Sequence, residues 1–361
     1  MDLPKQRLVA QHLIGPPLPH PEAVVASLLA VQSQDYAGAK WALAQRAASA
    51  GDEAVQQAFQ DGRILRTHVL RPTWHFVAPA DIRWLLALTA PRVHALNAYY
   101  YREHGIDAAL ARRAKNRIAK ALSRGTHLTR DELARALGEK DGTMAGSRLA
   151  CIIMHAELDG LICSGAMRGK QHTYALLDER APAAQPLGRD EALAEIARRY
   201  VAGHGPSQAK DLAWWSGLTL ADAKRGLAAC AGSLERCVVG TATYWFAPAP
   251  ATPRPGRPGP SKPSVHLLPN YDELVIAFKD RSAMLDPRVT PRTSVLAAHF
   301  VVVGGRIVGG WRRVLARREV VIAAQLLRPL SAAERRGLDA AAARYAANLG
   351  LEHRLEAEMV V

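Results

Sequence analysis

The sequence predicts an α+β fold that is mainly α-helical, with three tandem winged-helix modules followed by a small C-terminal β-barrel. Two observations support this fold class. Three consecutive segments repeat one order of patterns, helical periodicity followed by a two-stranded hairpin. Beyond a proline-rich stretch, the chain changes to closely spaced strand patterns with glycine turns. A chain of 361 residues is long enough for several such modules.

Residues 106–182 form the clearest of the three predicted modules. Thr129 and Glu132 have the T-x-x-E spacing of a capping box, which opens a helix. A second helix is expected to start near Ser147 and to stop at Gly160. The alternating stretches LICSG and HTYALL, separated by a glycine-bearing turn, then predict a hairpin. Helices followed by a hairpin in this order are typical of a winged helix.

The third module is expected at residues 183–247. One helix should end at Gly217, and the next should be capped by Thr219 together with Asp222. The stretch LERCVVGTATYWFAP then alternates around a glycine and predicts the hairpin.

The first module, residues 1–105, is less regular. It predicts helices near Pro21–Val31 and Gly38–Ala48, followed by paired strands in ILRTHVLRPTWHFVAP. Pro72 argues against an uninterrupted hairpin there, because proline cannot donate to a strand ladder.

A linker at residues 248–263 separates the modules from the rest of the chain. Seven prolines and no acidic residue lie between Ala247 and Pro263, which predicts a stiff, basic connector. Residues 264–361 then carry several strand patterns, two of them joined by a VGGR turn, and we expect these strands to form the barrel. A final helix, capped by Ser331 and stopped by Gly350, should follow.

The composition is strongly basic, with 47 Lys and Arg against 33 Asp and Glu and a formal net charge of +14. Such a surplus points to a polyanion, most often nucleic acid, although an arginine-rich proteome encoded at high GC content gives the same balance. Seven cations and no carboxylate lie between Ala108 and Arg130, which suits DNA phosphates or, alternatively, a solvated helix face. The candidate phosphate-binding residues are Arg112, Arg113, Lys115, Arg117 and Lys120.

Several other classes of site are not indicated. The four cysteines form no C-x-x-C pair, so neither a metal site nor a disulfide framework is expected. A cytoplasmic location is expected instead. The sequence shows no signal peptide and no apolar run long enough to span a membrane. It also lacks the common hydrolase, Walker and dinucleotide-binding motifs, so no cofactor is expected. Because LACIIMHAEL in the second module is mostly apolar, we expect the protein to make few sequence-specific contacts with base edges.

The segment Gln32-Ser33-Gln34-Asp35 places two amides and a carboxylate after an apolar stretch. Residues two apart do not share a helix face, so the two glutamines gain nothing from helical packing. From the residues alone, these side chains are interpreted as bridging or capping the next helix, with Asp35 as its N-cap.

Five stretches give this segment a second meaning: VQSQDYAGAKWALAQR, RPTWHFVAPADIRWLLAL, AWWSGL, LLPNYDELVIAFKDRS and GGRIVGGWRR. Together and in this order, over nearly the whole chain, they resemble the AlkZ/YcaQ-type winged-helix family of bacterial DNA glycosylases. In the AlkZ-like branch of that family a Gln-Φ-Gln motif is catalytic, and in the YcaQ-like branch a Gln-Φ-Asp motif. The resemblance implies that Gln32 and Gln34 are catalytic and that three winged helices form a C-shape beside a β-barrel. Ser33 departs from the family pattern, in which the middle residue is usually apolar.

The function that the resemblance implies is a monofunctional DNA glycosylase that hydrolyses the N-glycosidic bond of N7-alkylated purines and unhooks interstrand crosslinks. Alkylation makes the purine a cationic leaving group, so two neutral amides need only hold a water molecule. The expected partner is double-stranded DNA with alkylated bases, and the protein is expected to be a monomer associated with the nucleoid. The alternatives are a non-catalytic winged-helix DNA-binding protein or transcriptional regulator, and an inactive relative with a ligand-binding role.

Neighbouring residues carry two open alternatives. Thr73 and His75 either line the same cleft as the glutamines, or His75 is a buried structural residue. Arg281, with Asp272 and Lys279, either faces DNA or belongs to an internal set of ion pairs that docks the barrel.

If both glutamines address one water molecule, their side chains must point the same way, which an extended backbone allows and a helix does not. We therefore expect the helix that begins near Pro21 to end at or before Gln32, and residues 32–35 to be extended or irregular. Both glutamines should open towards the basic, concave side. Asp35 should cap the next helix or support a glutamine amide.

Overall fold

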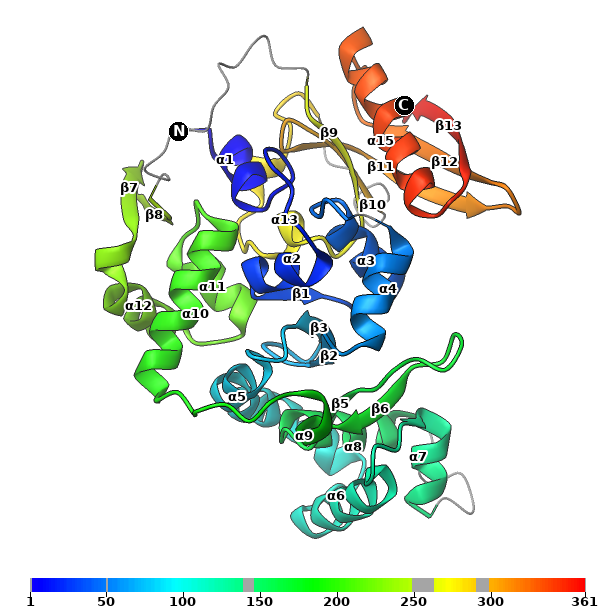
Figure 1. The fold of residues 1–361 in the computed structure, drawn as a ribbon. Coiled ribbons are helices and arrows are strands. Elements are labelled where there is room, and N and C mark those ends of the chain that lie inside the picture. The colour runs from blue at the N-terminus through cyan, green and yellow to red at the C-terminus, as the bar shows by residue number, and fades with distance from the viewer. Residues whose placement is uncertain (1, 50, 139–145, 249–262, 290–298, 361) are drawn as a thin grey trace.

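The computed structural model describes residues 2–49, 51–138, 146–248, 263–289 and 299–360, and Figure 1 shows their arrangement. The described residues contain both helices and strands, which confirms the predicted α+β class. Their strands fall into four sheets, each built from strands that follow one another in the sequence. None of the described helices combines the length and the apolar character needed to cross a membrane.

The first segment, residues 1–105, places a three-stranded sheet between helices. Its elements are α1 (Leu3–Ala10), α2 (Pro21–Leu28), β1 (Ala30–Gln32), α3 (Tyr36–Ala44), α4 (Asp52–Gln60), β2 (Leu65–His68), β3 (Trp74–Val77) and α5 (Ile82–Glu103). The sheet order is β1-β3-β2, with both pairs antiparallel. Pro72 lies in the loop between β2 and β3, so it removes no ladder hydrogen bond. The elements α1, β1, α4 and α5 were not among those predicted.

The second segment contains the helices and the hairpin that the sequence predicts. Its elements are α6 (Ala108–Leu122), β4 (Leu128–Thr129), α7 (Arg130–Ala136), α8 (Gly146–Leu158), β5 (Ile162–Ser164), β6 (Thr173–Leu176) and α9 (Leu177–Arg180). The capping box is confirmed, because the Thr129 hydroxyl accepts from the Glu132 N–H at 3.3 Å and the Glu132 carboxylate accepts from the Thr129 N–H at 2.8 Å. Helix α8 ends just before Gly160, whose φ of 69° turns the chain, and β5 pairs antiparallel with β6.

The third segment also keeps the predicted order. Its elements are α10 (Arg189–His204), α11 (Ala209–Ser216), α12 (Leu220–Ala229), a 3₁₀ turn (Ala231–Ser233), β7 (Glu235–Val239) and β8 (Ala242–Phe246). Gly217 ends α11 in the left-handed conformation, with φ of 70°. Thr219 caps α12 by accepting from the Asp222 N–H at 3.0 Å. Strands β7 and β8 form the hairpin.

The C-terminal segment is an open sheet, so the predicted closed barrel is wrong. Its elements are β9 (Val265–Leu268), α13 (Glu273–Ile276), a 3₁₀ turn (Ser282–Met284), β10 (His299–Val303), β11 (Arg306–Leu315), β12 (Glu319–Leu326), α15 (Ala332–Asn348) and β13 (Glu352–Met359). The order β13-β12-β11-β10-β9 leaves the outer strands β9 and β13 unpaired with each other among the described residues. The physical reason is α15, which crosses over the sheet, packs on β9 and β13, and returns the chain parallel to β12 at the far edge. The predicted cap at Ser331 and the glycine turn before β11 are both confirmed.

The stretch after β9 docks the C-terminal segment on the first segment. Arg46 binds the Asp272 carboxylate through two hydrogen bonds, at 2.7 Å and 2.9 Å, and the two side chains are 1% and 0% exposed. The Trp41 indole N–H donates to the Leu267 carbonyl at 2.6 Å. Figure 1 shows α13 near the centre of the molecule, beside β1. The docking alternative therefore holds for Asp272.

Two parts of the sequence prediction remain open at this stage. The linker lies largely outside the described residues, as do residues 290–298 of the predicted strand run. The domain boundaries and the assignment of winged helices stay predictions, although each segment has its expected helices and hairpin.

We expect acid to destabilise the fold through buried neutral histidines. Burial lowers the pKa of His75 and of His266 from 6.5 to about 3 in the folded protein. The unfolded chain therefore binds more protons below pH 6.5, so stability falls as the pH drops from about 6.5 towards 3, by up to about 1.4 kcal/mol per pH unit for each histidine. Urea unfolding of wild type and His266→Gln between pH 7.5 and 4.5 measures this slope. A variant slope as steep as that of wild type would contradict the assignment.

We expect Asp272→Asn to destabilise the protein by about 3–5 kcal/mol, because it leaves the buried Arg46 guanidinium without its counter-charge. Chemical denaturation measures the change. The control is Glu195→Gln, which breaks the exposed Arg198–Glu195 pair on α10 and should change stability by less than about 1 kcal/mol. Equal effects of the two substitutions would show that the Asp272 pair is not needed for docking.

Candidate active site

The backbone around Gln32 is extended, as predicted. Helix α2 ends at Leu28, and Leu29 turns the chain with a φ of 68°. Strand β1 follows at once, and residues 33–35 are irregular before α3 begins. Gln32 lies directly opposite His75 of β3, so the two side chains project from the same face of the sheet. The expectation that the helix ends before Gln32 is therefore confirmed.

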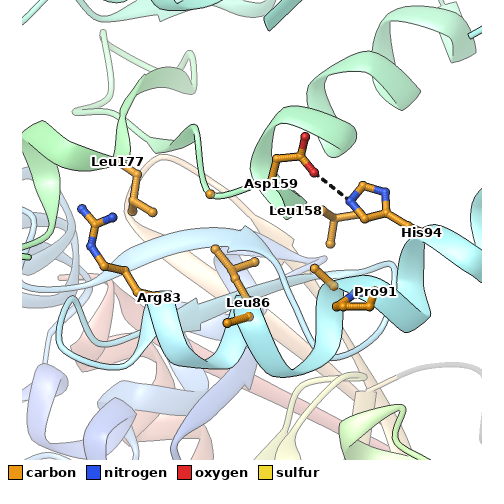
Figure 2. A pocket seen from close by; sticks show the side chains of 10 residues that line it. Arg83, Leu86, Pro91, His94, Leu158, Asp159 and Leu177 are labelled. Atoms are coloured by element: carbon orange, nitrogen blue, oxygen red, sulfur yellow. Dashed lines mark hydrogen bonds and ion pairs between the residues drawn. The ribbon is translucent and has the colours of Figure 1, made fainter. Parts of the chain in front are cut away.

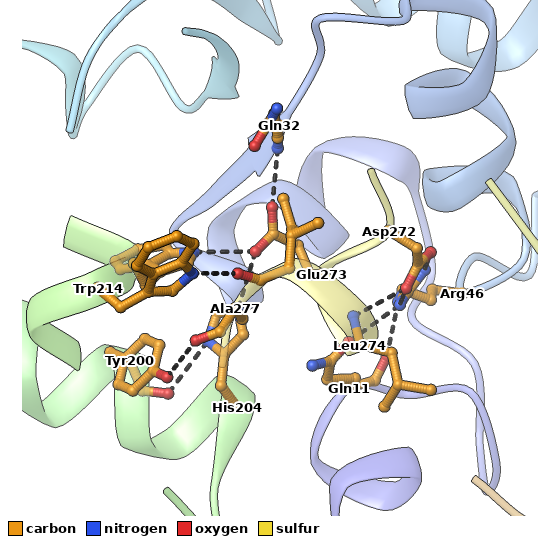
Figure 3. A network of polar contacts seen from close by, with 12 residues as sticks. Gln11, Gln32, Arg46, Tyr200, His204, Trp214, Asp272, Glu273, Leu274 and Ala277 are labelled. Carbon is orange, nitrogen blue, oxygen red and sulfur yellow. Dashed lines mark hydrogen bonds and ion pairs between the residues drawn. The ribbon is translucent and has the colours of Figure 1, made fainter. Parts of the chain in front are cut away.

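Gln32 is held on both its backbone and its side chain. Its N–H donates to Glu273 Oε1 at 2.8 Å, and its side-chain Oε1 accepts from Arg71 Nη2 at 3.0 Å. Figure 3 shows the first of these contacts, with the Gln32 side chain directed away from the Glu273 carboxylate. Only 7% of Gln32 is exposed. This corrects the expectation that both glutamines are open, because Gln32 is almost fully buried.

Gln34, in contrast, is exposed. Its Oε1 accepts from the backbone N–H of Trp74, the first residue of β3, at 3.4 Å. Both amide oxygens thus accept from donors in one short stretch of chain, Arg71 of the loop between β2 and β3 and Trp74 at the start of β3. The two glutamines therefore share this neighbouring stretch although their exposure differs.

Ser33 occupies a buried position between the two glutamines. It has no exposed surface, and its Oγ has no hydrogen-bond partner. Its carbonyl accepts from Arg66 Nε at 3.2 Å and Nη2 at 3.0 Å, and the Arg66 guanidinium lies over the Trp74 ring at 4.4 Å. Arg66 also lines a cavity of about 260 Å³ together with Arg130, His172 and Tyr174. The buried environment of Ser33 is one that an apolar side chain fits as well.

The supporting residues take up two kinds of position. Asp35 caps α3 by accepting from the Gly38 N–H at 3.1 Å, which decides between its two predicted roles. His75 has no exposed surface, and its Nδ1–H donates to the Thr73 carbonyl at 2.9 Å. His75 Nε2 and Thr73 Oγ1 are buried without a partner. His75 is thus a buried side chain on the same face of the sheet as Gln32, and it does not line an open cleft.

The segment Gln32–Asp35 has both cationic and anionic side chains as neighbours. Burial lowers the pKa of both the Arg66 and the Arg71 guanidinium, and neither forms an ion pair with a described residue. Burial opposes ionisation of Glu273, but the nearby His204 ring and the Gln32 N–H outweigh it, so the pKa of Glu273 lies below its ordinary value. An anionic carboxylate and two arginine cations therefore surround two neutral amides.

The predicted phosphate-binding residues of α6 do not all face solvent in the same way. Arg112, Arg113 and Lys120 are exposed. Lys115 pairs with Asp159, and Arg117 Nη1 donates to the Leu137 carbonyl at 2.6 Å. Helix α6 lies at the opposite end of the molecule from α15 (Figure 1), so these cations are remote from the C-terminal sheet. Arg281 is also exposed. It lies close enough to Arg71 to add to the effect of burial in lowering the pKa of the Arg71 guanidinium.

Among the described residues, His94, His155 and Asp159 form a group whose ligand atoms lie within 4.8 Å of one another, as a metal site requires. The Asp159 carboxylate is already paired with the Lys115 ammonium, and it accepts from His94 Nε2 at 3.0 Å. Figure 2 shows this contact beside a cavity of about 390 Å³, lined mainly by apolar side chains of α5 and the end of α8. Because Lys115 supplies the counter-charge, we assign the group to packing of these helices and not to a metal.

Sequence reasoning missed Glu273, Arg71 and Arg66 as neighbours of the glutamines. Arg71 and Glu273 fall within stretches that carry the family resemblance, RPTWHF and NYDEL, but no local pattern connects them with Gln32. Only the tertiary fold brings them together, across 39 and 241 positions of sequence.

Comparisons with known proteins identify the family of this chain. The model of the family described as DNA glycosylase AlkZ-like matches residues 25–348. An interstrand DNA cross-link repair glycosylase from Streptomyces sahachiroi is 27% identical over 224 residues, which is 59% of this chain and 59% of that protein. The match thus spans less than two thirds of the length of that relative. The structure of S. sahachiroi DNA glycosylase AlkZ is similar in fold, with a TM-score of 0.78 at 22% identity, covering 99% of this chain and 98% of that chain.

We expect Ser33→Ala to raise stability by about 1 kcal/mol, because it removes a buried hydroxyl that makes no hydrogen bond. The contact with Arg66 is retained, since it involves the Ser33 backbone carbonyl. The matched control is Ser216→Ala, which removes a buried hydroxyl that donates to the Leu212 carbonyl at 2.6 Å and should destabilise. Thermal and urea unfolding compare the two variants. Equal destabilisation would show that the Ser33 hydroxyl has a partner in solution.

Proposed function

Since the chain belongs to the AlkZ-like family of DNA glycosylases, we propose that it is a monofunctional glycosylase acting on N7-alkylated purines in double-stranded DNA. We further propose that it unhooks interstrand crosslinks made through such purines, the class of repair for which the S. sahachiroi relative is named. The observation that carries the proposal is the placement of Gln32 and Gln34 at the end of one strand, inside the region that the family model matches.

The proposed reaction is hydrolysis with water as the nucleophile. The bond between C1′ and N9 breaks, and its electron pair goes to the purine, whose positive charge is thereby neutralised. The oxygen of a water molecule bonds to C1′, and the proton that this water loses goes to solvent. The products are a neutral alkylated base and an abasic site. Because the leaving group is already activated, the enzyme needs no strong general acid and no cofactor.

The two glutamines hold the water in this proposal. Arg71 and the Trp74 N–H each occupy one lone pair of an amide oxygen, which leaves a second lone pair and the NH₂ group of each glutamine for other contacts. A water molecule can donate to the remaining lone pairs and accept from an NH₂ group. Positioning of this kind lowers the barrier by fixing the attack geometry, without removing a proton from the water in advance. The buried Gln32 would contact the water from the protein side, and the exposed Gln34 would contact it from the solvent side.

We also infer that the first three segments act as winged-helix modules that hold the duplex mainly by its backbone. The exposed Arg112, Arg113 and Lys120 of α6, together with the exposed Arg281 beside Arg71, suit phosphate contacts. Helix α8 carries mostly apolar residues, so it is suited to few sequence-specific contacts with base edges. The protein would bind as a monomer to chromosomal DNA in the cytoplasm.

We expect wild type to release 7-methylguanine from a duplex that contains it and to leave abasic sites. Gln32→Ala and Gln34→Ala should each slow release by on the order of ten- to a hundredfold, or about 1.4–2.8 kcal/mol of barrier, with duplex affinity unchanged. Single-turnover release and fluorescence anisotropy measure the two quantities. The control is Gln57→Ala, which removes an exposed glutamine from α4.

The contrary outcomes identify the rivals. Tight binding to one DNA sequence without base release would identify a regulator, and neither binding nor release would identify an inactive relative. A duplex crosslinked between two guanine N7 atoms tests the second part of the proposal, because unhooking returns separable strands on a denaturing gel.

A further inference from the structure

The orientation of the Gln32 amide is determined by its neighbour. The oxygen and nitrogen of an amide are similar in shape, so hydrogen-bond partners decide which way the group points. Arg71 lies against one end of this amide, and a guanidinium is only a donor. The end that faces Arg71 must therefore be Oε1, and Nε2 must point away from Arg71.

Arg71 itself is placed by the fold. It follows Leu70, which has a φ of 65°, in the loop between β2 and β3. This loop is pressed against the end of α11, where a Cβ built on Gly217 would lie 2.4 Å from the Leu70 carbonyl oxygen. The Arg71 guanidinium lies 5.9 Å from the centre of the Trp214 ring, and its Nε is buried without a partner. A long cationic side chain is thus confined beside Gln32, although no described carboxylate pairs with it.

Gln32 also lies between opposite charges. Glu273 accepts from its backbone N–H on one side, and Arg71 donates to its side chain on the other. Burial lowers the pKa of the Arg71 guanidinium, and the attraction of the nearby Glu273 carboxylate opposes that shift. The attraction favours the observed position of Arg71, so the carboxylate supports the orientation of the amide indirectly.

We propose, on the basis of the function proposed above, that Arg71 is a positioning residue for base excision, holding the Gln32 amide with its oxygen inward and its NH₂ group towards the substrate. Without Arg71 the amide is free to rotate by half a turn, and donor and acceptor then exchange places. A water molecule or nucleotide that fits one orientation does not fit the other, so a share of the molecules is unproductive. Arg71 therefore acts through Gln32 and not on DNA directly.

A double-mutant cycle tests this coupling. In the wild-type background, Arg71→Met should slow single-turnover release of 7-methylguanine about tenfold, while Arg71→Lys should recover part of the rate because one donor remains. In the Gln32→Ala background, Arg71→Met should change the rate less than about twofold, since there is no amide left to orient. Duplex affinity should stay within about twofold of wild type throughout. Arg198→Met, an exposed arginine on α10, controls for the lost charge.

Each other outcome overturns the proposal. If Arg71→Met slows release about equally in both backgrounds, or weakens duplex binding in step with the rate, Arg71 acts on DNA itself. If Arg71→Met releases base at the wild-type rate, the orientation of the amide does not matter. Where Arg71→Met unfolds, as thermal melting would show, the same cycle with Arg71→Lys decides. A wild-type protein that releases no base would remove the proposed function as well, whereas an active wild type with an equally active Gln32→Ala removes only the role of Gln32 and, with it, that of Arg71.

Discussion

Two adjacent carboxylates, Asp272 and Glu273, connect the C-terminal segment with the strand that carries Gln32. Asp272 is bound by Arg46, and Glu273 accepts from the Gln32 N–H and from the Trp215 indole at 2.9 Å. A buried charge that loses its partner is strongly unfavourable, so β1 and α11 are not free to move away from α13 separately. Residues of the first, third and C-terminal segments share one hydrophobic core around this point. The position of Gln32 is therefore a property of the whole fold and not of its own short strand.

The features that the sequence predicted correctly are those that neighbouring residues determine. The capping box at Thr129 and Glu132 needs only three residues of spacing, and the left-handed turn at Gly217 needs only a residue without a Cβ. The end of α2 before Gln32 was predicted from the chemistry of two amides, which must share a side, and the extended backbone agrees. Asp35 fits the same rule, since an aspartate three residues before Gly38 is a local cap.

The features that the sequence did not predict depend on contacts far apart in the chain. The buried Gln32 contacts Arg71 and Glu273, and no pattern in VQSQDY predicts either contact. Alternation in the C-terminal stretch identified strands but not whether their sheet closes. The outer edge of the open sheet is formed by β13, whose stretch EHRLEAEM alternates charged residues with others and is largely exposed. Charged side chains are typical of an edge strand, and this stretch beyond the predicted final helix was not among the predicted strands.

The proposed reaction, in which a strongly basic protein acts on a cationic base, has to reconcile two electrostatic demands. The net charge of +14 favours a polyanion, while the same field is unfavourable for binding a positively charged purine. In the proposed reaction, however, bond breaking creates no net charge, because the positive charge only moves from the purine to the sugar. A uniform positive potential therefore leaves the barrier unchanged, and only groups whose distances to the base and to the sugar differ affect it. Arg71, the two amide dipoles and the anionic Glu273 are such groups, because all of them lie within the immediate surroundings of Gln32. The basic surface can thus supply affinity for DNA without opposing the chemistry, provided that this small set of charges around Gln32 keeps its arrangement.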